Sequence, residues 1–126
     1  MILDSNIIIY SSRPEYPGLR KWIEVNSPAV SAASVVEVLG YHQITPSDKA
    51  HFEQFFASAD ILPIDTAVID RAVAIRQSRK MSLGDALIAA TALVFQRQLQ
   101  TRNIKDFVAI PGLSVNDPLA HGDPTL

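Results

Sequence analysis

The 126-residue sequence contains no cysteine. This absence excludes disulfide bonds, thiolate zinc sites and cysteine nucleophiles, and it agrees with a reducing compartment. No apolar run reaches the roughly 18–20 residues that a membrane-spanning helix needs. The opening residues Met1–Asp4 contain no basic segment of the kind that begins a signal peptide. We therefore expect a cytoplasmic protein that does not contact a membrane.

Several common catalytic motifs are missing as well. The sequence has no P-loop, no G-x-G-x-x-G and no G-x-S-x-G, so nucleotide binding and serine-hydrolase chemistry have no support. Its three histidines, His42, His51 and His121, are far apart in the sequence, and we interpret them as ordinary surface or half-buried side chains. Without a Cys or His cluster, a metal site in this chain has to be built from oxygen ligands.

Positive charge is also scarce for a protein that binds nucleic acid. The formal net charge is −2, whereas proteins that make broad phosphate contacts are usually basic. Attraction for a nucleic acid must then come from a local patch or from a metal ion. The candidate basic residues are Arg76, Arg79, Lys80, Arg97, Arg102 and Lys105. Taken by themselves, these residues fit solvated helix ends better than a binding patch.

The apolar residues that are present form short runs alternating with longer helical patterns. Short strands are predicted at 2–3, 28–31, 61–64, 99–101 and 113–115, whereas the run 7–10 could extend the first strand or begin a helix. A helix is predicted from Ser34 to about Gln43, and further helices are predicted to begin at Thr45, Asp65 and Ser82. This alternation predicts an α/β fold in which helices cover both faces of a central parallel β-sheet.

Repeats and linkers are absent, so a single domain is expected. We assign residues 1–117 to this domain. Residues 118–126 contain two prolines and one glycine, and we predict that they form a loose C-terminal tail.

Polar residues follow the predicted strands at their carboxyl ends, where open α/β sheets place their functional sites. Asp4 follows the first strand, and Glu37 lies in the helix after the second strand. Asp85 lies in the first turn of the most apolar helix, and Asn103 and Asp106 follow the strand at 99–101. Four of these five residues are acids from four separate stretches of the chain.

A purely structural interpretation competes with a functional one. The spacings Ser34-x-x-Glu37, Ser82-x-x-Asp85 and Asn103-x-x-Asp106 resemble helix capping boxes. Asp4 or Asn6 could likewise cap the first helix, and each acid taken alone fits a cap better than a catalyst.

Two positions favour a functional site. Asp4 ends a buried strand and Asp85 opens an apolar helix, so their charges are costly unless a cation or strong donors compensate. Three or four converging carboxylates would need a divalent cation, and such a cation suits phosphodiester hydrolysis.

Four segments in this order resemble the PIN-domain family, and among its members the VapC-type toxins. They are 2–8 (ILDSNII), 35–38 (VVEV), 82–92 (SLGDALIAATA) and 100–107 (QTRNIKDF). The segment 82–92 is the strongest match. The resemblance covers almost the whole chain except the tail, and it implies a three-layer α/β/α PIN-like domain.

The resemblance also implies a divalent-metal-dependent endoribonuclease that uses Mg²⁺ or Mn²⁺. Asp4, Glu37 and Asp85 would bind the metal, and Asn103 would complete the catalytic set. Many relatives carry aspartate where this chain has Asn103, and Asp106 is a candidate for the missing charge. Ser5 and Asn6 would support the metal ligands, and Arg102 and Lys105 would bind the substrate. The number of metal ions and the RNA cut stay open.

The partners that the resemblance implies are an RNA substrate, a cognate VapB-like antitoxin and a second copy of the chain in a homodimer. Operator DNA would be contacted only indirectly, through the antitoxin. Two other functions remain open: a non-catalytic PIN-fold module that retains an antitoxin interface, and a PIN nuclease of RNA processing without an antitoxin. Trp22 and its apolar neighbours could line an antitoxin groove, although core packing fits Trp22 better.

Overall fold

The computed structural model describes residues 1–125, and Leu126 lies outside the described residues. The elements along the chain are β1 (Ile2–Leu3), α1 (Ser5–Ser11), α2 (Pro17–Asn26), β2 (Ala29–Ser31), α3 (Ala32–Leu39), α4 (Pro46–Ser58), β3 (Ile61–Leu62), α5 (Thr66–Ser78), α6 (Leu83–Val94), β4 (Leu99–Gln100), α7 (Ile104–Phe107) and β5 (Val115–Asn116). In the described part of the chain, no helix is both long enough and apolar enough to cross a membrane.

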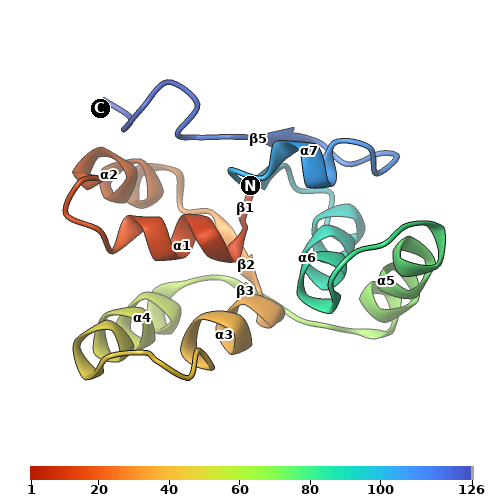
Figure 1. Ribbon diagram of the computed structural model, residues 1–126, viewed down its shortest axis with the longest axis horizontal. Helices are drawn as coiled ribbons and strands as arrows, with labels where there is room; N and C mark the ends of the chain where they lie inside the picture. Colours follow the sequence, from red (N-terminus) through yellow and green to blue (C-terminus); the bar gives the residue numbers. More distant parts are fainter. Residues whose placement is uncertain (126) are drawn as a thin grey trace.

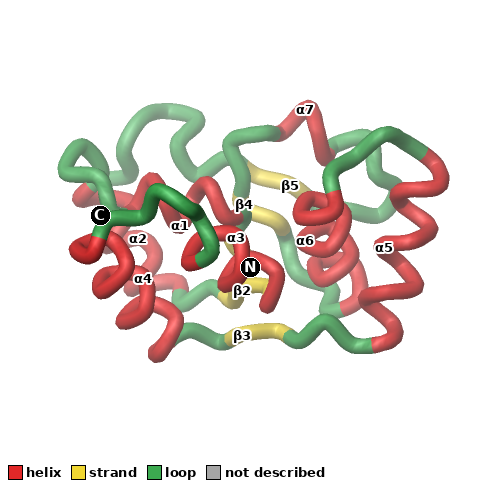
Figure 2. Tube along the Cα trace, turned by 60° about the horizontal axis from the view of Figure 1, so that its bottom comes forward, coloured by secondary structure: helices red, strands yellow, loops and turns green. Residues whose placement is uncertain are grey.

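The five strands form one parallel sheet in the order β3-β2-β1-β4-β5. Figure 2 shows the sheet in the middle of the molecule, with α1–α4 on one side and α5 and α6 on the other. This arrangement confirms the predicted three-layer α/β/α fold. The first strand lies at the centre of the sheet because the chain runs outward to β2 and β3 and then returns to β4 and β5 on the opposite side of β1.

Alternation along the strands divides the core in two. Successive side chains of a strand point to opposite faces of the sheet. Ile2 accordingly packs with the apolar residues of α5 and α6, whereas Leu3 packs with those of α1–α4. Both side chains are 0% exposed. Trp22 is half-buried against the α1–α4 core, which confirms the core-packing interpretation of this residue.

The structure decides or corrects where three helices and strands begin. The run 7–10 belongs to α1, because Asp4 caps this helix and ends the strand. Helix α3 begins at Ala32, two residues earlier than predicted, because the Ser31 hydroxyl accepts a hydrogen bond from the Ala33 N–H at 3.0 Å. The prediction of Ser34 as the first capping residue is therefore wrong. The last strand is Val115–Asn116 and begins two residues later than expected.

The C-terminal segment is packed against the domain, so the prediction of a loose tail is wrong. Leu119 is 2% exposed in the α1–α4 core. The Asp123 carboxylate accepts hydrogen bonds from the backbone N–H groups of Gly18 at 2.7 Å and Leu19 at 2.8 Å, so it caps α2 from a distant part of the chain. Figure 1 shows the end of the chain beside α2. The boundary at residue 117 stays a prediction.

Candidate active site

The candidate active site lies at the carboxyl ends of β1, β2 and β4. Asp4 joins β1 to α1, Glu37 lies in α3 after β2, and Asp85 lies in the first turn of α6. Asp106 lies in α7 after β4. We call these four acids the acidic centre. Three strands that neighbour one another in the sheet bring together residues that are up to 102 positions apart, Asp4 and Asp106 being the extremes.

Asp4 is the most constrained member of the acidic centre. It is 4% exposed, one carboxylate oxygen accepts from the Ser5 N–H at 2.8 Å, and the other accepts from the Thr101 hydroxyl at 2.7 Å. Burial raises the pKa of Asp4 to about 6, and the negative charges of Asp85 and Glu37 add to this rise while the Thr101 and Ser5 hydrogen bonds oppose it. The strand therefore ends in a buried carboxylate whose charge is only partly compensated.

Glu37 reaches toward the same place from α3. The Ser5 hydroxyl donates to its Oε1 atom at 2.8 Å and also lies 2.9 Å from the hydroxyl of the buried Ser34. A Cβ atom at Gly84 would overlap the Glu37 carboxylate, so the glycine is needed for this close approach. The predicted capping box at Ser34 and Glu37 is wrong, because both side chains meet Ser5 at the acidic centre.

Asp85 lies in the capped first turn of α6, and the charges of other acids act on its carboxylate. Its backbone N–H donates to the Ser82 hydroxyl at 3.2 Å, which confirms the predicted cap of α6. Burial raises the pKa of Asp85, the charges of Glu37 and Asp106 raise it further, and the Ser82 hydroxyl opposes the shift. The charges of Glu37 and Asp85 raise the pKa of Asp4, and the charge of Glu37 raises the pKa of Asp85, so the three acids repel one another electrostatically.

The segment after β4 forms the rim of the acidic centre. Asn103 is exposed at the start of α7, its backbone N–H donates to the Thr101 hydroxyl oxygen at 3.0 Å, and its side chain makes no capping hydrogen bond within the described chain. Asp106 is exposed, and so is Lys105. Arg102 forms an ion pair with Asp117 at 3.4 Å. The structure thus places Asn103 next to the acidic centre and directs Arg102 toward the C-terminal segment.

The acidic centre fits a hard divalent cation in its chemistry. Its donors are all oxygens, two of its carboxylates have raised pKa values, and the buried Asn6 Oδ1 atom beside Asp4 has no hydrogen-bond partner among the described residues. In residues 1–125, no three Asp, Glu or His side chains are already close enough to hold one ion. Side-chain movements would therefore have to accompany binding.

A family model of the PIN domain matches residues 1–111. The chain belongs to the PIN-domain family. A chain of a toxin–antitoxin complex from Klebsiella pneumoniae is 32% identical over 93% of this chain and 96% of that chain, with a TM-score of 0.73. None of the curated proteins searched matches the sequence.

More distant solved structures have the same fold. A chain of the DNA-bound VapBC complex from Salmonella typhimurium has a TM-score of 0.81 at 21% identity, covering 92% of this chain and 96% of that chain. A chain of VapBC2 from Rickettsia felis, bound to a DNA fragment from its promoter, has a TM-score of 0.80 at 20% identity with the same coverage. At this level of identity, the two likenesses concern the fold alone.

Three residues of this PIN domain that contact the acids were not predicted to lie at the acidic centre. Thr101 holds Asp4, Ser34 lies against Ser5, and Gly84 makes room for Glu37. A signal existed for Thr101, since it directly follows the strand that ends beside Asp4. Ser34 and Gly84 gave no comparable signal, because their roles depend on how closely α3 and α6 approach. The three histidines are all exposed, as expected.

Proposed function

We propose that this PIN domain is a divalent-metal-dependent endoribonuclease and the toxin of a VapBC-like toxin–antitoxin pair. The observation that carries the proposal is the buried Asp4 carboxylate, held by Thr101 and coupled to Asp85 and Glu37 at the carboxyl end of the sheet. A folded protein tolerates such a charge cluster when a cation compensates it, and PIN domains are generally nucleases.

Asp4, Glu37 and Asp85 are the residues that would hold Mg²⁺ or Mn²⁺. When bound, the ion supplies an activated water molecule and stabilises negative charge at the phosphate. Thr101 and Ser5 fix the orientations of Asp4 and Glu37, so that their oxygens are preorganised. Asn103 would contribute a neutral amide at the rim, where Asp106 adds the nearest further charge.

The direct test is sequencing of RNA ends after the protein is induced in cells. We expect new, discrete 5′ ends with wild type and none with Asp4→Asn. The asparagine oxygen can still accept from the Ser5 N–H, and its NH2 group can donate to the Thr101 hydroxyl in place of the present bond. Thermal unfolding should show that the variant is folded. Identical RNA ends from wild type and a folded Asp4→Asn variant would refute the catalytic assignment.

Calorimetry separates the enzyme from a non-catalytic binding module. The neutral Asn103 favours the module, because it removes a charge that many relatives have. We expect Mn²⁺ to bind wild type and to bind Asp4→Asn much more weakly. Absence of binding at millimolar metal would favour the module. If metal binding and cleavage both occur but no antitoxin gene lies nearby, the protein is a processing nuclease.

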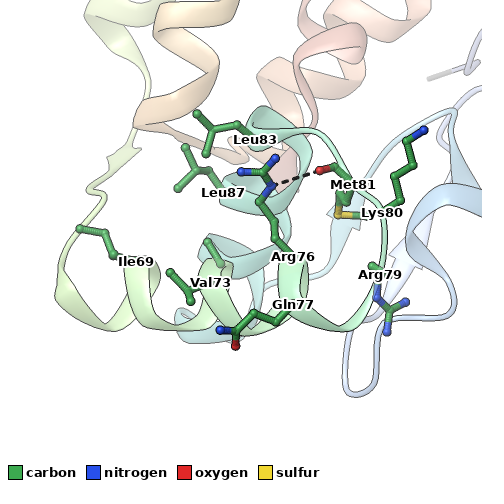
Figure 3. A pocket seen from close by; sticks show the side chains of 10 residues that line it. Ile69, Val73, Arg76, Gln77, Arg79, Lys80, Met81, Leu83 and Leu87 are labelled. Atoms are coloured by element: carbon green, nitrogen blue, oxygen red, sulfur yellow. Dashed lines mark hydrogen bonds between the residues drawn. The ribbon is translucent and has the colours of Figure 1, made fainter.

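We assign the homodimer interface to the groove between α5 and α6 (Figure 3). The groove has a volume of about 600 Å³. Ile69, Val73 and Leu83 contribute apolar surface to it and are 47%, 51% and 59% exposed. A second copy of the chain would remove this surface from water. Val73→Lys should convert a dimer to monomers in analytical ultracentrifugation.

We assign the antitoxin to a different groove, between α1 and the α3–α4 region. This groove, of about 520 Å³, is lined by Ile9, Tyr41, Ile44 and Phe52 among others. Ile9 and Tyr41 are 40% and 53% exposed, which suits the apolar face of a partner segment. The antitoxin would bring the complex to operator DNA. Ile9→Glu should abolish co-purification with the antitoxin, while RNA cleavage continues.

A further inference from the structure

Two arginines and two tyrosines form a cluster at the end of α1, and of these residues only Arg102 was expected to bind the substrate. The Arg13 guanidinium lies over the Tyr10 ring at 4.5 Å from its centroid, and the Arg102 guanidinium lies over the same ring at 6.0 Å. The Tyr16 ring contacts Tyr10 edge to face, with centroids 5.6 Å apart. We call these four residues the arginine–tyrosine cluster.

The cluster is connected to the acidic centre at two points. Tyr10 lies in α1, the helix that Asp4 caps, about 9 Å further along its axis at 1.5 Å per residue. Arg102 directly follows Thr101, whose hydroxyl donates to Asp4. Both connections run through short, hydrogen-bonded pieces of backbone, so the cluster is held at a fixed distance from the acidic centre.

The two arginines are held in place but remain accessible. Asp117, whose side chain is only 13% exposed, forms an ion pair with Arg102, whose side chain is 38% exposed. Arg13 is exposed, and its carbonyl oxygen accepts a hydrogen bond from the Arg20 guanidinium at 2.8 Å. Arg20 also donates to the Ser11 carbonyl at 3.0 Å, which ties the end of α1 to α2. Arg13, Arg20 and Arg102 therefore gather positive charge at the end of α1, in a protein whose net charge is −2.

We propose that the arginine–tyrosine cluster is a binding subsite for single-stranded RNA, which guides the strand toward the acidic centre. The inference rests on the proposed ribonuclease function and adds residues to it. Arginine guanidinium groups pair with phosphates and stack on bases, and aromatic rings offer a platform for further bases. The subsite also explains how an acidic protein attracts a polyanion, because the attraction is local.

The chemistry of the cluster favours RNA over an acidic protein segment. Carboxylates also pair with guanidinium groups, but they gain nothing from an aromatic ring beside the cation. This cluster instead combines planar cations with aromatic rings, a combination that recognises unpaired bases. The exposed Arg13 is the group that we expect to contact the strand first, and Arg102 directly follows Thr101, which holds Asp4.

The test is fluorescence anisotropy with a labelled ten-nucleotide oligouridylate in EDTA, so that no cleavage interferes. The variants are Arg13→Gln, Arg102→Gln and the double variant, with Arg71→Gln as a matched control on the exposed surface of α5. We expect the double variant to bind at least about tenfold more weakly. The slope of log Kd against log salt should fall by about 1.4, since each phosphate contact to a single strand contributes about 0.7. The control should bind like wild type.

Cleavage assays separate this inference from the proposed function. In Mg²⁺, the double variant should show a raised KM and a nearly unchanged kcat on a short oligonucleotide. If wild type cleaves RNA but the double variant binds as tightly and with the same salt slope, the subsite is refuted and the nuclease stands. If wild type does not cleave RNA but the double variant loses affinity as expected, the nuclease is refuted and the subsite stands. Equal losses of affinity for oligoglutamate and oligouridylate would overturn the assignment to RNA.

Discussion

Asp4 and Asp65 both cap the start of a helix, but they differ in burial and in their other contacts. Asp4 caps α1 through the Ser5 N–H at 2.8 Å, and Asp65 caps α5 through the Val68 N–H at 2.9 Å. Asp65 is exposed, whereas Asp4 is 4% exposed and also bonds to Thr101. Capping geometry alone therefore does not separate a structural acid from a functional one. What separates them is the burial of the carboxylate and the influence of other acids on it.

The largest effect should be on catalysis. Asp85→Asn should lower the rate of RNA cleavage by about 1,000-fold or more, since a metal ion contributes several kcal/mol and each 1.36 kcal/mol is a factor of ten. Asp65→Asn should cleave at the wild-type rate, because its side chain lies outside the acidic centre. A fluorogenic RNA substrate in Mg²⁺ measures both rates. Similar rates for the two variants would remove the distinction between the two kinds of aspartate.

The next effect is on stability and concerns Asp4 in the metal-free protein. The pKa of Asp4 is raised to about 6 in the folded state, above the value of about 3.9 that aspartate has in an unfolded chain. The folded state then binds more protons between these pH values, so the stability of wild type should fall as the pH rises through this window. Above pH 6 the Asp4 carboxylate is ionised, and the full cost of burying its charge lowers the free energy of unfolding.

Asp4→Asn has no such penalty, so it should be more stable than wild type by about 1–3 kcal/mol at pH 7.5, and the difference should vanish near pH 4. Urea unfolding of both proteins in EDTA at several pH values measures this. Asp65→Asn serves as the matched variant and should show no comparable gain. A stability gain of Asp4→Asn that is independent of pH would contradict the charge-based explanation.

A smaller change tests the approach of α3 and α6. Gly84→Ala should reduce cleavage by about tenfold, because the new methyl group displaces the Glu37 carboxylate from its place. Stability should stay the same or rise by up to about 1 kcal/mol, because alanine favours a helix. The Ala74→Gly variant at an exposed position of α5 serves as a reference for the helix contribution. A Gly84→Ala variant with full activity would show that Glu37 is not needed where it lies.

The smallest effect should come from the structural cap. Asp65→Ala should lower the free energy of unfolding by about 1 kcal/mol without changing cleavage, because only the Val68 N–H loses its acceptor. Urea unfolding and the same RNA assay measure the two quantities. Loss of activity in a folded Asp65→Ala protein would place α5 in the catalytic machinery, contrary to the comparison above.

Much of the fold could be predicted from local signals. The alternation of short apolar strands with longer helices predicted the parallel sheet, and Thr45, Asp65 and Ser82 marked three helix starts correctly. Helix α3 was placed too late because Ser31 and Ser34 both lie before apolar residues, and only the packing of Ser34 against Ser5 separates them. The tail was misjudged because the acceptors and donors that hold it are far apart in the sequence.

The acidic residues could be listed from the sequence, but their arrangement could not. Position after a strand indicated Asp4, and position in the first turn of the most apolar helix indicated Asp85. The distances that hold Glu37 depend on a missing side chain at Gly84 and on the Ser5 hydroxyl, and no spacing rule contains such contacts. The roles of Asp4, Glu37, Asp85 and Asn103 in metal binding and catalysis stay predictions.

The bond between Asp123 and α2 links the timing of synthesis to the completion of the fold. The N–H groups of Gly18 and Leu19 appear early during translation, whereas their acceptor is made more than a hundred residues later. A growing chain therefore has α2 without this cap until residue 123 is added. A premature stop anywhere before residue 123 would release a polypeptide in which the N–H groups of Gly18 and Leu19 lack this acceptor, and the start of α2 would open more readily to proteases.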